Sequence, residues 1–189
     1  MRARSVSSPA LGFVLTACLV AGCGSSGSSS SGELAPNGSL NDGAPAASPA
    51  AAPPSSIPPQ QLYKTILERY RAYQAAYKKA YETNNPAELP TFAMDPLLSQ
   101  VTKDVEATRA KGEIWRFTNT FNPRVYARAK DSTKIYVIDC VRTLAAYRYS
   151  ADTGKRTGEV PGGAYVYRAT VQYDSGAWKV AANVRDRPC

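Results

Sequence analysis

In residues 113–130, EIWRFTNTFNPRVYARAK, the spacing of the apolar residues changes from that of a helix to that of a β-strand. In this stretch apolar and polar side chains alternate, as is typical of a strand with one buried face. The apolar positions that recur with a period of two are Trp115, Phe117, Phe121, Val125, Ala127 and Ala129. We therefore predict that a β-sheet begins after Gly112.

Further strands are predicted toward the C-terminus, separated by short turns. Segments such as Asn122-Pro123 and Asp152-Thr153-Gly154 supply the turn residues. The predicted strands are 133–142, 144–150, 163–173 and 177–185. No helix remains between these strands to make the crossovers of a parallel sheet, so we expect an antiparallel sheet of five to six strands.

Before Gly112 the apolar residues recur at spacings of three and four, which predicts amphipathic helices. The first helix begins near Pro59, and a second starts at Asn85-Pro86, where Glu88 completes a capping box. A third follows Asp95-Pro96 and ends at Gly112. The predicted fold class is α+β, with three N-terminal helices packed on one face of the antiparallel sheet.

The composition excludes several kinds of chemistry. The chain has 189 residues, 23 Lys or Arg against 15 Asp or Glu, a net charge of +8 and no histidine. A Ser-His-Asp triad, a Cys-His pair and a histidine-ligated zinc site are therefore excluded. No motif indicates a cofactor or a metal site.

The first 23 residues have the features of a bacterial lipoprotein signal peptide. Arg2 and Arg4 precede an apolar run from Ala10 to Ala21, which is shorter than the roughly 20 residues that a membrane-spanning helix needs. Val20-Ala21-Gly22-Cys23 resembles a lipobox, which would make Cys23 the acylated N-terminus of the mature protein. Two alternatives remain: acylation at Cys18, and an ordinary cleaved signal peptide.

Residues 24–59 are dominated by Gly, Ser, Ala and Pro, which predicts a disordered tether with a root-mean-square span of about 30–35 Å. Residues 60–189 contain all 12 tyrosines and are predicted to form one domain. The expected location is therefore the cell membrane, with the domain anchored by lipid on the extracytoplasmic face.

Several short motifs of the domain occur in a characteristic order: the helical hairpin, Ile138-Asp139-Cys140, the Asp152-Thr153-Gly154 turn, residues 176–180 (GAWKV) and the terminal cysteine. In this arrangement the domain resembles the NTF2-like superfamily, the cone-shaped α+β domains that include ketosteroid isomerase-like proteins. The resemblance implies a curved sheet and a secreted, lipid-anchored protein. Family members often have an acid at the position of Arg142, and the superfamily includes isomerases, dehydratases, transport factors and accessory domains.

The remaining cysteines, Cys140 and Cys189, form an even pair outside the reducing cytosol, and we predict a disulfide between them. The alternative is two free thiols. A bond across this segment would stabilise the fold by about 4 kcal/mol.

Asp139 is the one candidate catalytic residue. It shares a predicted strand face with Ile135, Val137 and Val141, so an apolar environment could raise its pKa, with tyrosines of the first helix nearby. The alternative places Asp139 at the rim of the sheet, paired with Arg142 or Arg148. The residues Tyr70, Tyr73 and Tyr77 likewise have two interpretations, as part of the core or as the wall of a pocket.

Arg124, Arg128 and Lys130 are predicted to share one strand face with Tyr126 and to form an anion-contacting surface. Such a face would be attracted to anionic envelope polymers or lipid headgroups, or would simply be solvated. No nucleic-acid-binding motif is present. The expected function is a non-enzymatic binding or scaffolding module at the cell envelope, with another envelope protein as an alternative partner. The alternative activity is that of a small lyase or isomerase using Asp139 and the tyrosines.

Overall fold

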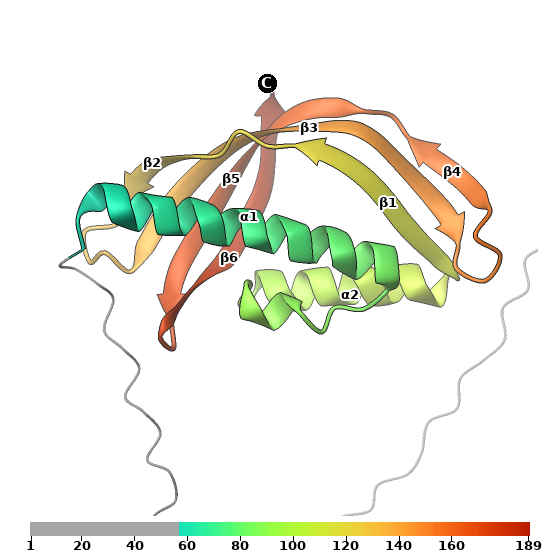
Figure 1. Cartoon of the computed structure of the whole chain (residues 1–189), viewed down its shortest axis with the longest axis horizontal. Coiled ribbons are helices and arrows are strands. Elements are labelled where there is room, and N and C mark those ends of the chain that lie inside the picture. The colour runs from blue at the N-terminus through green and yellow to red at the C-terminus, as the bar shows by residue number, and fades with distance from the viewer. Residues whose placement is uncertain (1–56) are drawn as a thin grey trace, which may run out of the picture. The chain divides into compact units, whose positions relative to one another are not determined.

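The computed structural model describes residues 57–189, in which a curved antiparallel sheet of six strands arches over two α-helices (Figure 1). The signal peptide, Cys18, Cys23 and the tether up to Ser56 lie outside the described residues. Among the residues described, no helix is long and apolar enough to cross a membrane. The predicted α+β class, with helices on one face of a curved antiparallel sheet, is confirmed.

The helices are α1 (Pro59–Thr83) and α2 (Leu97–Ala110), joined by a segment that contains the 3₁₀-helix η1 (Leu89–Thr91). The prediction of a full second helix from Asn85-Pro86 is wrong. The side chain of Asn85 accepts the N–H of Ala87 in a local turn, and Glu88 pairs with Lys79 instead of capping a helix. Pro90 has no N–H to donate, so only a short 3₁₀ turn forms.

The strands are β1 (Glu113–Thr120), β2 (Arg124–Arg128), β3 (Lys134–Ser150), β4 (Arg156–Val160), β5 (Gly163–Asp174) and β6 (Ala177–Pro188). The strand order is β1-β3-β5-β6, and β2 and β4 also pair with β3. The two strands predicted at 133–142 and 144–150 are one continuous strand, and β4 was not predicted. The other predicted strands are present, with boundaries shifted by a few residues.

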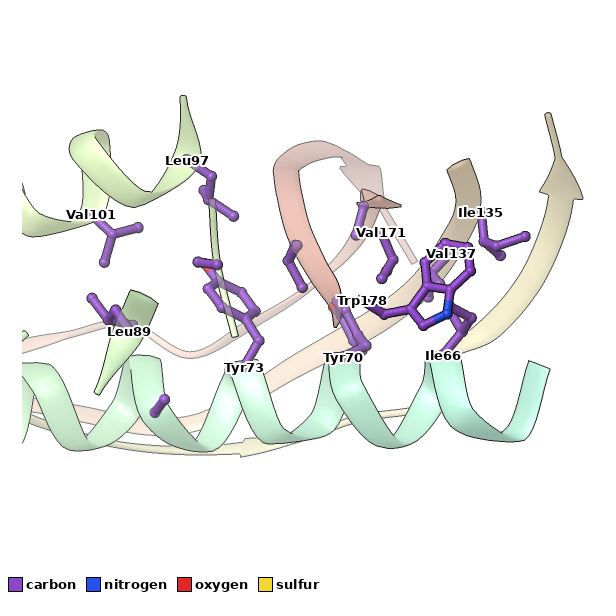
Figure 2. Packing of buried hydrophobic residues seen from close by; sticks show 14 of the residues in the cluster. Ile66, Tyr70, Tyr73, Leu89, Leu97, Val101, Ile135, Val137, Val171 and Trp178 are labelled. Carbon is purple, nitrogen blue, oxygen red and sulfur yellow. The ribbon is translucent and has the colours of Figure 1, made fainter. Parts of the chain in front are cut away.

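A hydrophobic core lies between the helices and the inner side of the sheet (Figure 2). Ile66 and Tyr70 of α1 are fully buried and point toward Val137 and Val171 of the sheet, with Trp178 beside them. Because α1 presents these residues at spacings of three and four, one helix face is buried along much of its length. The same core includes Leu97 and Val101 of α2, so it joins both helices to the sheet.

A β-bulge in β2 contradicts the prediction that Arg124, Arg128 and Lys130 share one face of the sheet. Arg124 lies opposite Ile138, whereas Arg128 lies opposite the buried Ile135, because the register shifts between Val125 and Ala127. Cross-strand partners share a side of the sheet, so Arg124 and Arg128 are on opposite sides. Arg128 donates to the Ser132 hydroxyl, and Lys130 lies in the following turn. The three residues therefore do not form one surface.

A disulfide joins the C-terminal end of the chain, just after β6, to the middle of β3. Cys140 and Cys189 form a disulfide, and the N–H of Cys189 donates to the Ala164 carbonyl at 3.1 Å. Cys140 lies opposite Val166, on the side of the sheet away from the helices.

Candidate functional site

A cavity of about 590 Å³ lies between the two helices and the concave side of the sheet. It lies beside the apolar core, since Tyr73, Leu97 and Val101 belong to both the core and the cavity lining. Five strands and both helices contribute residues to its lining, with Val160 as the contribution of β4. Its main lining residues are Tyr73, Gln74, Tyr77 and Tyr81 of α1, Gln100, Val101, Asp104 and Thr108 of α2, Trp115, Phe117 and Asn119 of β1, Val141, Thr143 and Ala146 of β3, Tyr165 and Tyr167 of β5, and Asn183 and Arg185 of β6.

Aromatic rings form one wall of the cavity. The ring of Tyr77 lies 4.9 Å from that of Tyr81, 6.1 Å from that of Tyr73 and 5.8 Å from that of Phe117, all tilted. Burial raises the pKa of the Tyr73, Tyr77 and Tyr81 phenols above the ordinary value of 10.0. These hydroxyls are therefore protonated at neutral pH and present a wall that is apolar on the ring faces and hydrogen-bonding at the tips.

Two asparagines that line the cavity each have an amide oxygen without a hydrogen-bond partner among the described residues. Oδ1 of Asn119 and Oδ1 of Asn183 are buried and accept no hydrogen bond from any residue in 57–189. The amide of Asn183 also lies beside the Tyr73 phenol. A buried acceptor without a donor costs free energy, so both oxygens are suited to an O–H or N–H group of a bound molecule.

Asp139 does not line the cavity. It is 1% exposed, and the backbone N–H of Asn122 donates to its Oδ1 at 2.7 Å. Its Oδ2 has no hydrogen-bond partner among the described residues. Burial raises the pKa of the carboxyl above its ordinary value, while the Asn122 N–H and the nearby Tyr70 and Arg71 oppose that rise. The alternative that placed Asp139 at the rim with Arg142 or Arg148 is wrong, because β3 turns Asp139 toward the helices.

Two side chains separate Asp139 from the cavity. Gln74, which lines the cavity, donates from Nε2 to the Tyr70 hydroxyl at 2.8 Å. Tyr70 in turn lies next to Asp139 and has its pKa raised by burial and then by that carboxylate. The contacts Gln74–Tyr70 and Tyr70–Asp139 thus link the cavity wall to the carboxylate.

The charged side chains of the cavity are at its edge. Asp104, Lys111 and Arg185 are exposed, and the Arg185 guanidinium stacks on the Tyr165 ring at 4.5 Å. Within residues 57–189 no cluster of three acidic or sulfur side chains could hold a metal ion. The interior thus offers neutral polar groups and aromatic faces.

The structure brings together only part of the predicted site. Tyr73 and Tyr77 line the cavity, whereas Tyr70 and Asp139 lie behind it in the core. Asn119 was not predicted, although its position two residues after Phe117 in an alternating strand was a signal that it faces inward. Asn183 gave no such signal, because a bulge at Ala181, between Val180 and Ala182, shifts the register of β6.

No family model and no curated protein matches this chain. Among solved structures, the intermembrane-space region of the chloroplast protein ARC6 is similar over 69% of this chain and 98% of its own, at 14% identity and a TM-score of 0.53. A putative scytalone dehydratase from Novosphingobium aromaticivorans is similar over 69% and 89%, at 16% identity and a TM-score of 0.46. A putative dehydratase of the NTF2-like family from Streptomyces avermitilis follows at 66% and 97%, with 14% identity and a TM-score of 0.43. At these identities the likeness concerns the fold alone. The fold and the cavity together fit a binding module or a small enzyme.

Proposed function

We propose that this protein is a lipid-anchored, extracytoplasmic binding module whose cavity takes a small uncharged molecule. The observation that supports binding over catalysis is the position of Asp139: the cavity is open, yet the buried carboxylate lies outside it, behind Gln74 and Tyr70. Small-molecule sites are commonly cavities of 300–1,000 Å³ with aromatic walls and a few polar groups, as here. Acylation at Cys23 and export would hold this module at the outer face of the membrane.

The lining predicts the chemistry of the bound molecule. Aromatic rings favour a flat apolar framework, and the unpartnered oxygens of Asn119 and Asn183 favour O–H or N–H groups on it. A charged molecule is disfavoured, since none of the described groups in the interior would neutralise it.

2-Naphthol is a suitable probe because it is flat, uncharged at pH 7, fluorescent and carries one O–H. We expect the full chain to bind it, and to bind naphthalene, which lacks the hydroxyl, about tenfold more weakly. Fluorescence titration of each compound gives the two affinities. Equal affinities would show that the amide oxygens contribute nothing.

A pair of tryptophan substitutions locates the binding. Ala146 lines the cavity, whereas Leu144 is 56% exposed and does not. Ala146→Trp should fill the cavity and abolish 2-naphthol binding, while Leu144→Trp should leave it unchanged. Thermal unfolding of both variants establishes that they are folded. Loss of binding in both or in neither contradicts the assignment of the cavity.

A small isomerase or lyase is the second candidate, favoured by the buried path from Gln74 through Tyr70 to Asp139. A base that acts through this path should accelerate exchange of the acidic C–H protons of 2-tetralone in D₂O, as followed by NMR. The binding module predicts no acceleration by the wild-type chain. Acceleration that disappears in Asp139→Asn would favour the enzyme.

A further inference from the structure

The outer side of the sheet carries a row of arginines that the helices do not cover. Figure 1 shows α1 and α2 on the inner side only, so the outer side of β3 and its neighbours faces away from them. We refer to five exposed arginines on this side as the arginine stripe: Arg116, Arg124, Arg142, Arg156 and Arg168.

The register of the strands aligns the stripe along β3. Arg124 of β2 and Arg168 of β5 both lie opposite Ile138, and Arg142 follows four residues later on β3 itself. Arg116 of β1 lies opposite Tyr147, and Arg156 of β4 opposite Tyr149. At about 3.4 Å per residue, the positions from 138 to 149 extend over about 35 Å.

Tyrosines of β3 hold two of these arginines in place. The Arg156 guanidinium lies 4.0 Å from the centre of the Tyr147 ring, and that of Arg116 lies 4.8 Å from the Tyr149 ring. Stacking on a ring restricts the guanidinium plane but leaves its N–H edges available for hydrogen bonds.

The stripe has more positive charge than its acidic neighbours neutralise. Glu159 pairs with Arg156, and Asp186 pairs with Arg168 at 2.8 Å. Arg116, Arg124 and Arg142 make no ion pair within residues 57–189. Three exposed guanidinium groups in a row over the sheet thus have no counter-charge from the described chain.

We propose that the arginine stripe binds a flexible polyanionic chain that carries phosphate groups. Guanidinium groups hydrogen-bond phosphate through two parallel N–H groups, and an array of them about 35 Å long matches repeated anions better than a single one. The sheet is curved outward on this side, so a flexible polymer can follow all five arginines, whereas a flat lipid surface would contact only part of the row (Figure 1).

Inorganic polyphosphate is the probe for this surface, and the test uses the full chain with Cys23→Ala so that no acyl group contributes. We expect Arg116→Gln/Arg124→Gln/Arg142→Gln to lower polyphosphate affinity about tenfold at 0.1 M salt. The slope of log K against log salt should become shallower by about 2, since each phosphate contact on a single-stranded polyanion contributes roughly 0.7.

The matched control changes the same net charge on the helices. Lys64, Lys103 and Arg109 are exposed on α1 and α2, and Lys64→Gln/Lys103→Gln/Arg109→Gln should reduce affinity less than about threefold. Equal losses in both triple variants would overturn the proposal, because binding would then follow net charge alone. Tighter binding to phosphatidylglycerol vesicles than to polyphosphate would also overturn it. Circular dichroism and thermal unfolding establish that both variants are folded, and 2-naphthol binding should be unchanged in both.

Discussion

The carboxylate of Asp139 is hydrogen-bonded on one side only. Oδ1 accepts the Asn122 N–H, while Oδ2 is buried without a partner among residues 57–189. Because burial raises the pKa of Asp139 above its ordinary value of 3.8, the folded chain binds this proton more tightly than the unfolded chain does. This residue therefore contributes stability that is fully present below pH 3.8 and is lost as the pH rises through the raised pKa.

Asp139→Asn should remove this loss of stability at higher pH. The Asn side chain keeps an oxygen for the Asn122 N–H and has no charge to bury. We expect the free energy of unfolding at pH 7 to rise by about 1 kcal/mol, and its decline between pH 4 and 7 to become smaller. Urea unfolding at several pH values measures both. Asp139→Ala, which also loses the Asn122 hydrogen bond, should be less stable than both the wild type and Asp139→Asn. If Asp139→Asn is instead less stable than the wild type, the ionised carboxylate is favourably paired in the folded chain.

The buried tyrosines predict instability at high pH. The pKa values of Tyr70, Tyr73 and Tyr77 are raised from 10.0, mainly by burial. Above pH 10 the unfolded chain loses these phenolic protons while the folded chain keeps them, so stability should fall by up to about 1.4 kcal/mol per pH unit for each tyrosine. Urea unfolding from pH 8 to 11 measures the slope. Tyr77→Phe should make it shallower, and Tyr126→Phe, at a residue that is 49% exposed, is the control.

Among the elements, β3 is the central strand: it pairs with β1, β2, β4 and β5, whereas β6 pairs with β5. The Cys140–Cys189 disulfide joins the end of β6 directly to β3 and closes a segment of 49 residues. Loss of the bond in Cys140→Ala/Cys189→Ala should lower the free energy of unfolding by about 4 kcal/mol. Chemical denaturation of the wild type with and without reductant, beside the double variant, measures this. Equal stability of all three would mean that the bond does not constrain the unfolded chain.

The sequence predicted those elements whose local pattern and tertiary packing agree. In α1, Leu62, Ile66 and Tyr70 recur at helical spacing and are all buried, so the helix could be predicted from its apolar face. The segment around Pro86 has capping residues but two more prolines, at 90 and 96, and too little chain between them for a helix. Strand β4 (Arg156–Val160) is exposed at four of its five positions, so no apolar alternation marked it.

The site was less predictable than the fold because it depends on register. Tyr73 and Tyr77 could be proposed from helix spacing, but the inward direction of Asn183 follows from a bulge in β6. The bulge in β2 likewise separates Arg124 from Arg128, which simple alternation placed together. One extra residue in a strand moves all later side chains to the other face, and no local pattern in this chain announced it.

For the whole molecule, the two sides of the sheet provide separate surfaces. The cavity is lined by inward residues such as Ala146 and Thr143, and the stripe by outward residues such as Arg142 and Arg116. Substitutions on either side should therefore act additively, since no side chain is shared. A protein with both surfaces could hold a small molecule while bound to a polymer, provided that the chain is exported and anchored.

The proposed location at the membrane depends on the lipid anchor, and substitution of Cys23 tests whether that anchor exists. Acylation at Cys23 predicts that the wild-type chain, expressed in a Gram-positive bacterium, enters the detergent phase of a Triton X-114 partition and incorporates a palmitate probe. Cys23→Ala should lose the probe and move to the aqueous phase, because no other acyl group would hold it to lipid. Cys18→Ala is the matched control and should behave as the wild type. If Cys18→Ala loses the probe and Cys23→Ala keeps it, the acylated position is wrong; if the wild type itself is unlabelled and aqueous, the protein is not a lipoprotein.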